Sequence, residues 1–249
     1  MGKRERLDKL LVDRGLVISR EQGRGKIMAG EVLVDNQPVT KAGFLVDVGA
    51  TIRLKSDAIP YVSRGGLKLA KALQEFQIDV NGKTVIDAGA SSGGFTDCLL
   101  AHGALQVYAV DVGYGQLDWK LRNDPRVIVF EKTNVRYLTA ADLPQAADVA
   151  TLDLSFISLR LVLLPIKGLL VPGGAVVALI KPQFEVGKGK VGKGGVVRSS
   201  DEHRRVIGEI SDAAIALSFA VCGVTESPLL GPKGNKEFFI HLRTPPMAS

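Results

Sequence analysis

The spacing of apolar positions divides the chain into a short first part and a longer second part. Residues 6–15 carry leucines at helical spacing and end at Gly15, a pattern typical of a short amphipathic helix closed by a glycine. Ser19 is placed to cap a second helix that Gly30 would end. The stretches EVLVDNQPV and ATIRLK then alternate as strands do. We therefore predict a small α+β domain over residues 1–55.

The second part alternates strand-like apolar runs with helical patterns, after a predicted linker at residues 56–62. This alternation is typical of a parallel sheet covered by helices. The last two strands follow each other without a helix, as an antiparallel pair at the end of the sheet would. We therefore predict that residues 63–249 form a Rossmann-like α/β domain with a seven-stranded sheet. Its expected strands are residues 84–88, 106–111, 127–130, 148–152, 175–180, 219–224 and 237–242.

Positive charge is concentrated in the first domain. The chain has a formal net charge of +6, and residues 1–55 hold 11 Lys and Arg against 7 Asp and Glu, a surplus of 4. This charge favours a phosphate-rich partner, although solvated helix faces would carry it equally well. The cations that crowd the two predicted helices, and that we predict to bind nucleic acid, are Arg6, Lys9, Arg20, Arg24 and Lys26.

Cysteine use and hydropathy exclude several classes of protein. Cys98 and Cys222 belong to no Cys-x-x-C or Cys/His cluster, so we expect no disulfide framework and no metal site. The charged N-terminus lacks the apolar stretch of a secretory signal. The apolar residues 161–171 and 213–224 are shorter than the roughly 20 that a spanning helix needs, so we interpret them as a core helix and a helix-to-strand passage. We expect a cytoplasmic protein without a membrane partner; the oligomeric state stays open.

A glycine-containing turn in TVIDAGASSGGFTDCLL follows an apolar strand and precedes a helix. Glycines let the backbone approach a ligand, and the helix N-terminus offers free N–H groups. The turn matches neither the dinucleotide fingerprint G-x-G-x-x-G nor the phosphate loop G-x-x-x-x-G-K-[ST]. The residues of this segment that we predict to bind a cofactor are Asp87, Gly89, Ser91, Gly93, Gly94 and Phe95.

Two acidic residues indicate the chemistry of that cofactor. Asp111 ends the second strand of the larger domain, where a carboxylate usually accepts hydrogen bonds from a ribose diol. Asp87 would repel a pyrophosphate but attract the amino group of a methionine moiety. The pair therefore favours S-adenosylmethionine over a dinucleotide. Asn134, just after the third strand, is a candidate for the adenine edge or a simple helix cap.

Four charged residues lie where the sheet should bind ligands. Asp153 and Lys181 end apolar strands, Glu237 opens the last strand, and Lys68 lies in a helix before the first strand. Each alone fits a structural ion pair. Together they suit attack by a ribose 2′-hydroxyl, a poor nucleophile whose proton a partly desolvated lysine could accept. In this interpretation Asp153 and Glu237 hold the lysine and the substrate in line.

The chain resembles the TlyA family of rRNA 2′-O-methyltransferases, long described as hemolysins, whose catalytic domain is similar to the FtsJ (RrmJ) type. RLDKLLVDRGLVISREQGRGKIMAGEVLVDNQPV resembles the RNA-binding domain of small-subunit ribosomal protein S-four. SRGGLKL, DAGASSGGFTD, LDLSFISL, KPQFE, GKGGVVR and GNKEFF resemble successive blocks of the methyltransferase part. The resemblance implies an S-adenosylmethionine-dependent methyltransferase sheet with an N-terminal RNA-binding domain.

The family's Lys-Asp-Lys-Glu tetrad carries over onto Lys68, Asp153, Lys181 and Glu237, with Lys71 as a competitor for the first position. The resemblance implies that Lys181 is the base or the cation that positions the substrate, with Asp153 as its partner. It implies that Lys68 contacts a ribose or phosphate and that Glu237 orients the reacting groups. The implied substrate is a cytidine in ribosomal RNA, presented as free RNA or in ribosomal subunits.

Three other functions compete with this interpretation. A non-catalytic RNA-binding assembly factor would be expected to have lost a tetrad residue or the glycine turn. A base N-methyltransferase would be expected to place an Asn/Asp-Pro-Pro-Tyr-like motif after the fourth strand, where this chain has Asp153-Leu154-Ser155-Phe156. A membrane-lysing toxin is opposed by the lack of an export signal and of a spanning segment.

Overall fold

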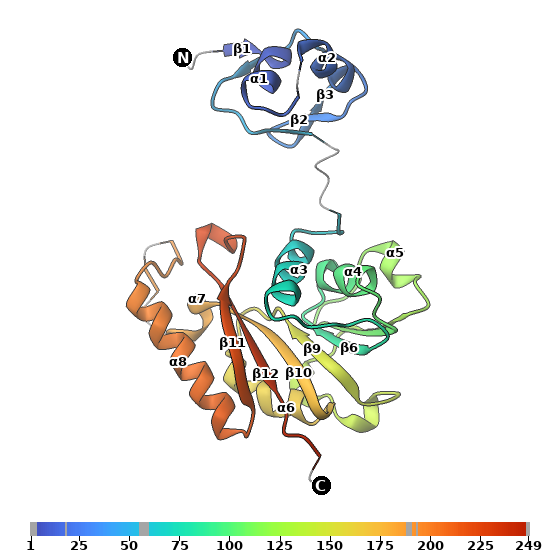
Figure 1. Cartoon of the computed structure of the whole chain (residues 1–249), viewed down its shortest axis with the longest axis vertical. Helices are drawn as coiled ribbons and strands as arrows, with labels where there is room; N and C mark the ends of the chain where they lie inside the picture. The colour runs from blue at the N-terminus through green and yellow to red at the C-terminus, as the bar shows by residue number, and fades with distance from the viewer. Residues whose placement is uncertain (1–3, 18, 55–59, 188–190, 193, 248–249) are drawn as a thin grey trace. The chain divides into compact units, whose positions relative to one another are not determined.

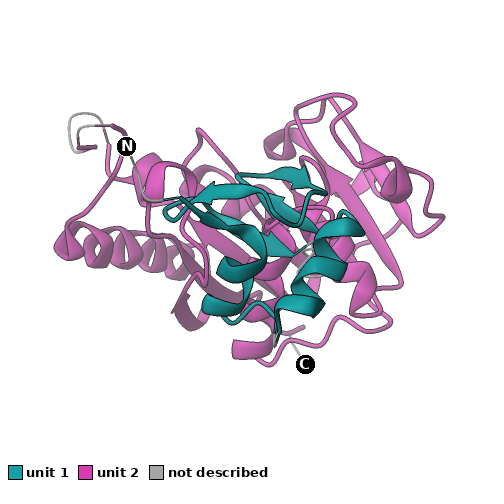
Figure 2. Ribbon diagram, turned by 90° about the horizontal axis from the view of Figure 1, so that it is seen from above, with its two compact units in different colours: residues 1–59 teal, residues 60–249 magenta. Residues whose placement is uncertain are grey.

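The computed structural model describes residues 4–17, 19–54, 60–187, 191–192 and 194–247. The chain divides into two compact units, Met1–Ile59 and Pro60–Ser249, which Figure 2 colours separately. Each unit has a hydrophobic core of its own. Most of the predicted linker at residues 56–62 lies outside the described residues.

The first unit packs two helices on short strands. Ser19 caps α2 by accepting the Gln22 N–H at 3.2 Å, and Gly15 and Gly30 adopt the left-handed conformation beyond the ends of the two helices, as predicted. β1 pairs with β4, and β2 pairs with β3 and β5, all antiparallel. The elements are β1 (Arg4–Arg6), α1 (Leu7–Asp13), α2 (Arg20–Met28), β2 (Val32–Val34), β3 (Gln37–Val39), β4 (Leu45–Asp47) and β5 (Ile52–Leu54).

The second unit is built on one sheet of seven strands in the order β11-β12-β10-β9-β6-β7-β8. β12 is antiparallel to both of its neighbours, and the pairs from β10 to β8 are parallel, as predicted. The strands are β6 (Thr84–Ala88), β7 (Gln106–Val110), β8 (Val127–Phe130), β9 (Ala147–Leu152), β10 (Leu170–Ile180), β11 (Ala220–Glu226) and β12 (Phe238–Arg243).

Helices cover both faces of this sheet, so it has an apolar core on each side (Figure 1). One core joins the sheet to α6 and α8, and the other joins it to α3, α4 and α5. Every residue of β6 is buried, as expected of a central parallel strand. The helices are α3 (Gly65–Glu75), α4 (Gly94–Ala101), α5 (Trp119–Arg122), α6 (Leu163–Lys167), α7 (Pro182–Glu185) and α8 (Ser200–Ala216), with 3-10 turns η2 (Val135–Tyr137), η3 (Ala140–Asp142), η4 (Leu159–Leu161) and η5 (Pro232–Gly234).

The interpretation of residues 161–171 as one core helix is wrong. The segment contains the end of η4, the short α6 and the beginning of β10. Gly168 ends α6, and β10 begins early with a register irregularity between Leu170 and Ala175, around Gly173 and Gly174. None of the described helices is both long and apolar enough to cross a bilayer.

Parallel pairing places the carboxyl ends of β6, β7, β9 and β10 at one edge of the sheet. Ligands bind at this edge in open α/β sheets, often where the strand order reverses. Here the order reverses at β6, between β7 and β9. The fold therefore brings the glycine turn after β6 next to the residues that follow β9.

Candidate active site

The turn after β6 has a conformation and a packing that require glycine. Gly89 has φ +87°, and a Cβ there would lie 2.5 Å from the carbonyl oxygen of Asp153. The N–H groups of Gly89 and Ala90 both donate to the Val110 carbonyl, at 2.8 and 3.2 Å. The turn is thus held between β7 and the segment after β9, with its backbone free to face a ligand.

Asp111 fixes the same turn from the end of β7. Its carboxylate accepts the Ser91 N–H at 2.8 Å and the Gly113 N–H at 2.7 Å, one on each oxygen. Because an ionised carboxylate has about four acceptor positions, Asp111 can still accept bonds from a diol. The prediction that Asp111 binds a ribose is compatible with this geometry.

A cavity of about 680 Å³ lies beside this turn. Its volume is within the usual range for small-molecule sites, and its wall combines polar groups with apolar side chains. Asn134 lines it and also caps η2, accepting the Arg136 N–H at 3.1 Å, so both predicted roles fit. We call it the cofactor cavity. Its lining residues include Gly89, Ser91, Asp111, Asn134, Asp153 and Ser158.

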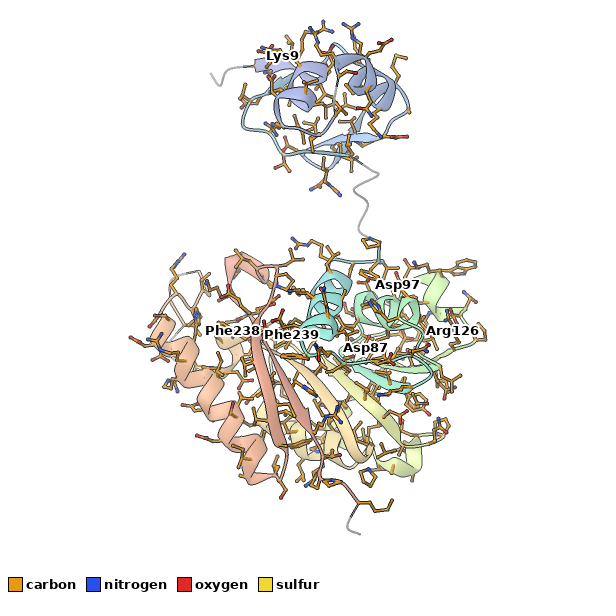
Figure 3. The ribbon with its side chains drawn as sticks, in the orientation of Figure 1. Lys9, Asp87, Asp97, Arg126, Phe238 and Phe239 are labelled. Atoms are coloured by element: carbon orange, nitrogen blue, oxygen red, sulfur yellow. The ribbon has the colours of Figure 1, made fainter. Side chains whose placement is uncertain are left out.

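The structure differs from the prediction for Asp87, which is fully buried and lines neither this cavity nor the catalytic cavity described next. Its carboxylate accepts hydrogen bonds from Thr96 Oγ1 at 2.6 Å and Thr151 Oγ1 at 3.4 Å. Burial, together with the charge of Asp153, raises the pKa of Asp87 to about 7, against the effect of the hydrogen bonds from Thr96 and Thr151. Asp87, labelled near β6 in Figure 3, therefore supports the turn from within the sheet.

Three other residues of the glycine segment also lie away from the cofactor cavity. Gly93, at φ +95°, begins α4 and packs so tightly against Leu117 and Leu121 that a Cβ would overlap them. Gly94 and Phe95 line a second, adjacent cavity.

This second cavity, of about 380 Å³, is lined by all four predicted tetrad residues: Lys68, Asp153, Lys181 and Glu237. They come from α3, the end of β9, the end of β10 and the start of β12. We call it the catalytic cavity. The fold thus brings together four charges that are up to 169 positions apart in the sequence.

The first charge pair joins neighbouring strand ends. Lys181 Nζ lies 2.6 Å from Asp153 Oδ1, in the geometry of an ion pair and not of a directed hydrogen bond, and it donates to Ser155 Oγ at 2.9 Å. The Lys181 side chain is only 10% exposed. Its ammonium is therefore held at the cavity wall with little freedom to move.

The second charge pair joins α3 to the start of β12. Lys68 Nζ donates to Glu237 Oε2 at 2.6 Å, and the Glu237 side chain is fully buried. The other oxygen of Glu237 has no hydrogen-bond donor among the described residues. It packs against Gly231, where a Cβ would overlap the carboxylate. Lys71, the competitor for Lys68, instead pairs with Glu75 at 2.9 Å on the outer surface of α3.

The catalytic and cofactor cavities share three lining residues: Gly89, Ser91 and Asp153. The two cavities therefore adjoin, and molecules bound in them would lie next to each other at these three residues. This is the arrangement that a group transfer between two bound molecules requires.

In the first unit, three arginines converge on one buried acid. Arg6, Arg20 and Arg24 contact the Asp8 carboxylate at 2.9 to 3.1 Å. The hydrogen bond from Arg6 holds the pKa of Asp8 well below its usual range, although burial opposes this. The three side chains are 42 to 53% exposed, so this arginine cluster keeps a net charge of +2 at the surface.

The other two predicted cations of this unit lie in simple surface pairs. Lys9, labelled in Figure 3, pairs with Glu5 at 2.8 Å, and Lys26 pairs with Glu31 at 2.9 Å. Such pairs contribute little to stability. Arg6 also differs from the prediction in its location, because it belongs to β1 and not to the first helix.

Comparison with known families is consistent with both units. An S4 domain model matches residues 5–52, and an FtsJ-like methyltransferase model matches residues 61–244. The chain belongs to the FtsJ-like methyltransferase family. The predicted family and fold are therefore confirmed.

Relatives of this FtsJ-like chain match it over almost its whole length. It is 50% identical to the "Putative rRNA methyltransferase YqxC" of Bacillus subtilis, over 98% of this chain and 87% of the relative. It is 47% identical to the 16S/23S rRNA (cytidine-2'-O)-methyltransferase TlyA of Mycobacterium tuberculosis, over 98% and 91%. A solved structure described as a "putative hemolysin" from Streptococcus thermophilus is 44% identical, with a TM-score of 0.76, over 98% and 90%.

Several residues that hold the FtsJ-like site in place were not predicted from the sequence. Ser155 follows Asp153 by two positions, which could have marked it as a contact of Lys181. Gly231 stands out only once its packing on Glu237 is known. The sequence carries no signal for the burial of Glu185, nor for that of Asp8 in the first unit.

Proposed function

We propose that the chain transfers a methyl group from S-adenosylmethionine to the 2′-hydroxyl of a cytidine in ribosomal RNA. The observation that carries this proposal is the catalytic cavity, where four charges surround a space that shares the wall of Gly89, Ser91 and Asp153 with the cofactor cavity. The curated relative from Mycobacterium tuberculosis bears this activity in its name. A ribosomal substrate would place the protein in the cytoplasm.

The residues present fit S-adenosylmethionine. The turn at Gly89 leaves no room for a side chain, and Ser91 and Asp111 present polar groups at the cofactor cavity wall. Asp111 is placed for the ribose hydroxyls and Asn134 for the adenine edge. When bound, S-adenosylmethionine supplies a methyl group on a positively charged sulfur, and this group is open to attack by an oxygen nucleophile.

The chain's own residues hold the attacking oxygen and its proton. Lys181 is placed to bind the 2′-oxygen and, in its neutral form, to take the proton as the new oxygen–carbon bond forms and the sulfur–carbon bond breaks. Asp153 and Ser155 keep Lys181 Nζ at the wall shared by both cavities. Lys68, held by Glu237, is placed to contact the ribose or its phosphate.

The S4 unit supplies RNA affinity. In the arginine cluster, Asp8 uses only part of the donors of Arg6, Arg20 and Arg24, so the remaining N–H groups can bind phosphate oxygens. Contacts to phosphate carry no sequence information, so we expect the cluster to contribute affinity and not sequence selection.

We expect Arg24→Ala to weaken binding to ribosomal RNA and to lower the slope of log affinity against log salt concentration by about 1, since one phosphate contact is lost. Filter binding over a salt series measures this slope. Arg53→Ala is the matched control, because Arg53 lies in the same unit and bonds Asn36 outside the cluster. An unchanged slope for Arg24→Ala would remove the cluster from the RNA interface.

The proposed reaction is tested by incubating the protein with methyl-labelled S-adenosylmethionine and ribosomal subunits from cells that lack the gene. We expect label on a 2′-O-methylcytidine after digestion to nucleosides. Label on a base nitrogen would instead assign a base methyltransferase. Tight RNA binding with no transfer to any subunit would assign a non-catalytic assembly factor.

A further inference from the structure

Two segments that carry the catalytic charges are linked a second time, outside the catalytic cavity. Asp153 and Lys181 follow the neighbouring parallel strands β9 and β10. Beyond them the chain continues as the loop of residues 153–158 and as α7, respectively. Glu185, the last residue of α7, crosses between these segments: its carboxylate accepts the Ser158 hydroxyl at 2.5 Å and the Leu159 N–H at 2.8 Å.

Glu185 is a buried acid that the reaction itself does not use. It is 4% exposed and lines neither the cofactor cavity nor the catalytic cavity. Burial raises its pKa, and the two hydrogen bonds oppose this. Because a buried carboxylate is costly unless donors compensate it, a residue that only packed here would be better as an apolar side chain. Its position is explained by the two donors that it holds.

The loop that Glu185 holds forms one wall of the cofactor cavity. All of its residues from Asp153 to Ser158 line that cavity. Phe156 within it has φ +63°, a conformation that is unfavourable for a bulky side chain, and its ring is 90% exposed. Such a backbone persists only where its surroundings fix it. The fixing contacts are Lys181 to Ser155 on one side and Glu185 to Ser158 and Leu159 on the other. Between them the Phe156 ring packs on the Phe184 ring of α7, with 4.9 Å between the centroids.

We propose that Glu185 is a positioning residue that fixes the loop of residues 153–158, and so sets both the cofactor affinity of the chain and the alignment of Asp153 with Lys181. This proposal rests on the proposed function, since it assigns the loop to S-adenosylmethionine. Glu185 acts through Ser158 and Leu159 and touches neither substrate.

The test compares Glu185→Ala, Glu185→Gln and Ser158→Ala. Binding of S-adenosylhomocysteine is measured by calorimetry without RNA, and kcat and KM are measured with ribosomal subunits. We expect Glu185→Ala to raise the Kd for S-adenosylhomocysteine by about tenfold and to lower kcat by about 10- to 100-fold, because small displacements of catalytic groups are costly. Glu185→Gln, whose amide oxygen still accepts the Leu159 N–H, should recover most of both losses.

Ser158→Ala removes one hydroxyl and keeps the proposal testable if Glu185→Ala does not fold. It should raise the same Kd by a smaller factor. Adding it to Glu185→Ala should have little further effect on this Kd, since the contact between Glu185 and Ser158 is already broken and only the bonds from Arg160 to Ser158 are lost in addition. Glu75→Gln is the control, because Glu75 is an acid of α3 that pairs with Lys71 and lies outside both cavities. RNA affinity should not change in any of these variants.

The outcomes separate this inference from the proposed function. If the wild-type chain binds no S-adenosylhomocysteine, the proposed function fails. If the wild type binds it and folded Glu185→Ala or Ser158→Ala binds and turns over equally well, the positioning role of Glu185 is overturned. A loss in Glu185→Ala that Glu185→Gln does not recover at all would also overturn it, because the role assigned is acceptance of hydrogen bonds.

Discussion

Replacing Lys181 with methionine should lower kcat for methyl transfer to ribosomal subunits by about 10²- to 10⁴-fold, the usual contribution of a positioned proton acceptor. Lys181 Nζ lies 2.6 Å from Asp153 and 2.9 Å from Ser155 at the wall shared by both cavities. Methionine keeps the length and the apolar stem of lysine but cannot hold a hydroxyl or take its proton. Single-turnover transfer of labelled methyl groups measures the loss.

Cofactor affinity separates a chemical loss from a binding loss in this variant. Lys181 lines the catalytic cavity and not the cofactor cavity, but its bond to Ser155 helps to fix the loop of residues 153–158. The Kd for S-adenosylhomocysteine should therefore rise by no more than about tenfold, roughly 1.4 kcal/mol, which is less than the loss in kcat. Lys71→Met, which removes an exposed lysine of α3, should transfer methyl groups as the wild type does. Transfer by Lys181→Met at more than a tenth of the wild-type rate would exclude Lys181 as the central residue of the reaction.

The sequence predicted the positions of three tetrad residues well because strand ends are local features. Asp153 and Lys181 each end an apolar run that is buried on both faces of a parallel sheet. The alternation of strands and helices in the sequence predicts the parallel sheet to which these two runs belong. Glu237 opens a strand in the same way. Each such charge alone fits a structural ion pair, and the pattern is informative because several of them fall at the same edge of the sheet.

The choice between Lys68 and Lys71 could not be made from the sequence. Three positions on a helix differ by about 60° in direction, so both lysines lie near the same side of α3. What separates them is the partner of each: Glu237 for Lys68 and Glu75 for Lys71. The first partner is distant in the sequence, and only the folded chain shows it.

The roles of buried acids were the least predictable part of the site. Asp87 has the residue type and position of a cofactor contact, yet its side chain bonds Thr96 and Thr151 inside the sheet. Asp8, for which no role was predicted, is the centre of the arginine cluster. Burial and hydrogen-bond direction depend on packing between elements, and local patterns do not encode them. The strands β1 and β4 were missed because β1 consists of three charged residues and shows no apolar pattern, and its pairing with β4 is seen only in the folded chain.

Substitutions in the Lys68–Glu237 pair should separate its effect on the stability of the fold from its effect on methyl transfer. Glu237→Ala leaves the Lys68 ammonium in a largely buried place without its partner, and breaking a buried pair in this way costs about 3–5 kcal/mol. We therefore expect this variant to unfold at markedly lower urea concentration. Replacing both residues, as Lys68→Met with Glu237→Leu, removes the charges together and should restore stability to about the wild-type level or above.

The double variant should nevertheless transfer no methyl groups, because it lacks the charges that we propose to hold the ribose in the catalytic cavity. Urea unfolding is followed by far-ultraviolet circular dichroism, because Trp119, the single tryptophan, is 78% exposed and its fluorescence would change little. The labelled transfer assay reports on the reaction. A double variant that is stable but inactive would show that the reaction needs this charge pair and the fold does not. An active double variant would instead assign the pair to structure and leave Lys181 and Asp153 as the chemical residues of the cavity.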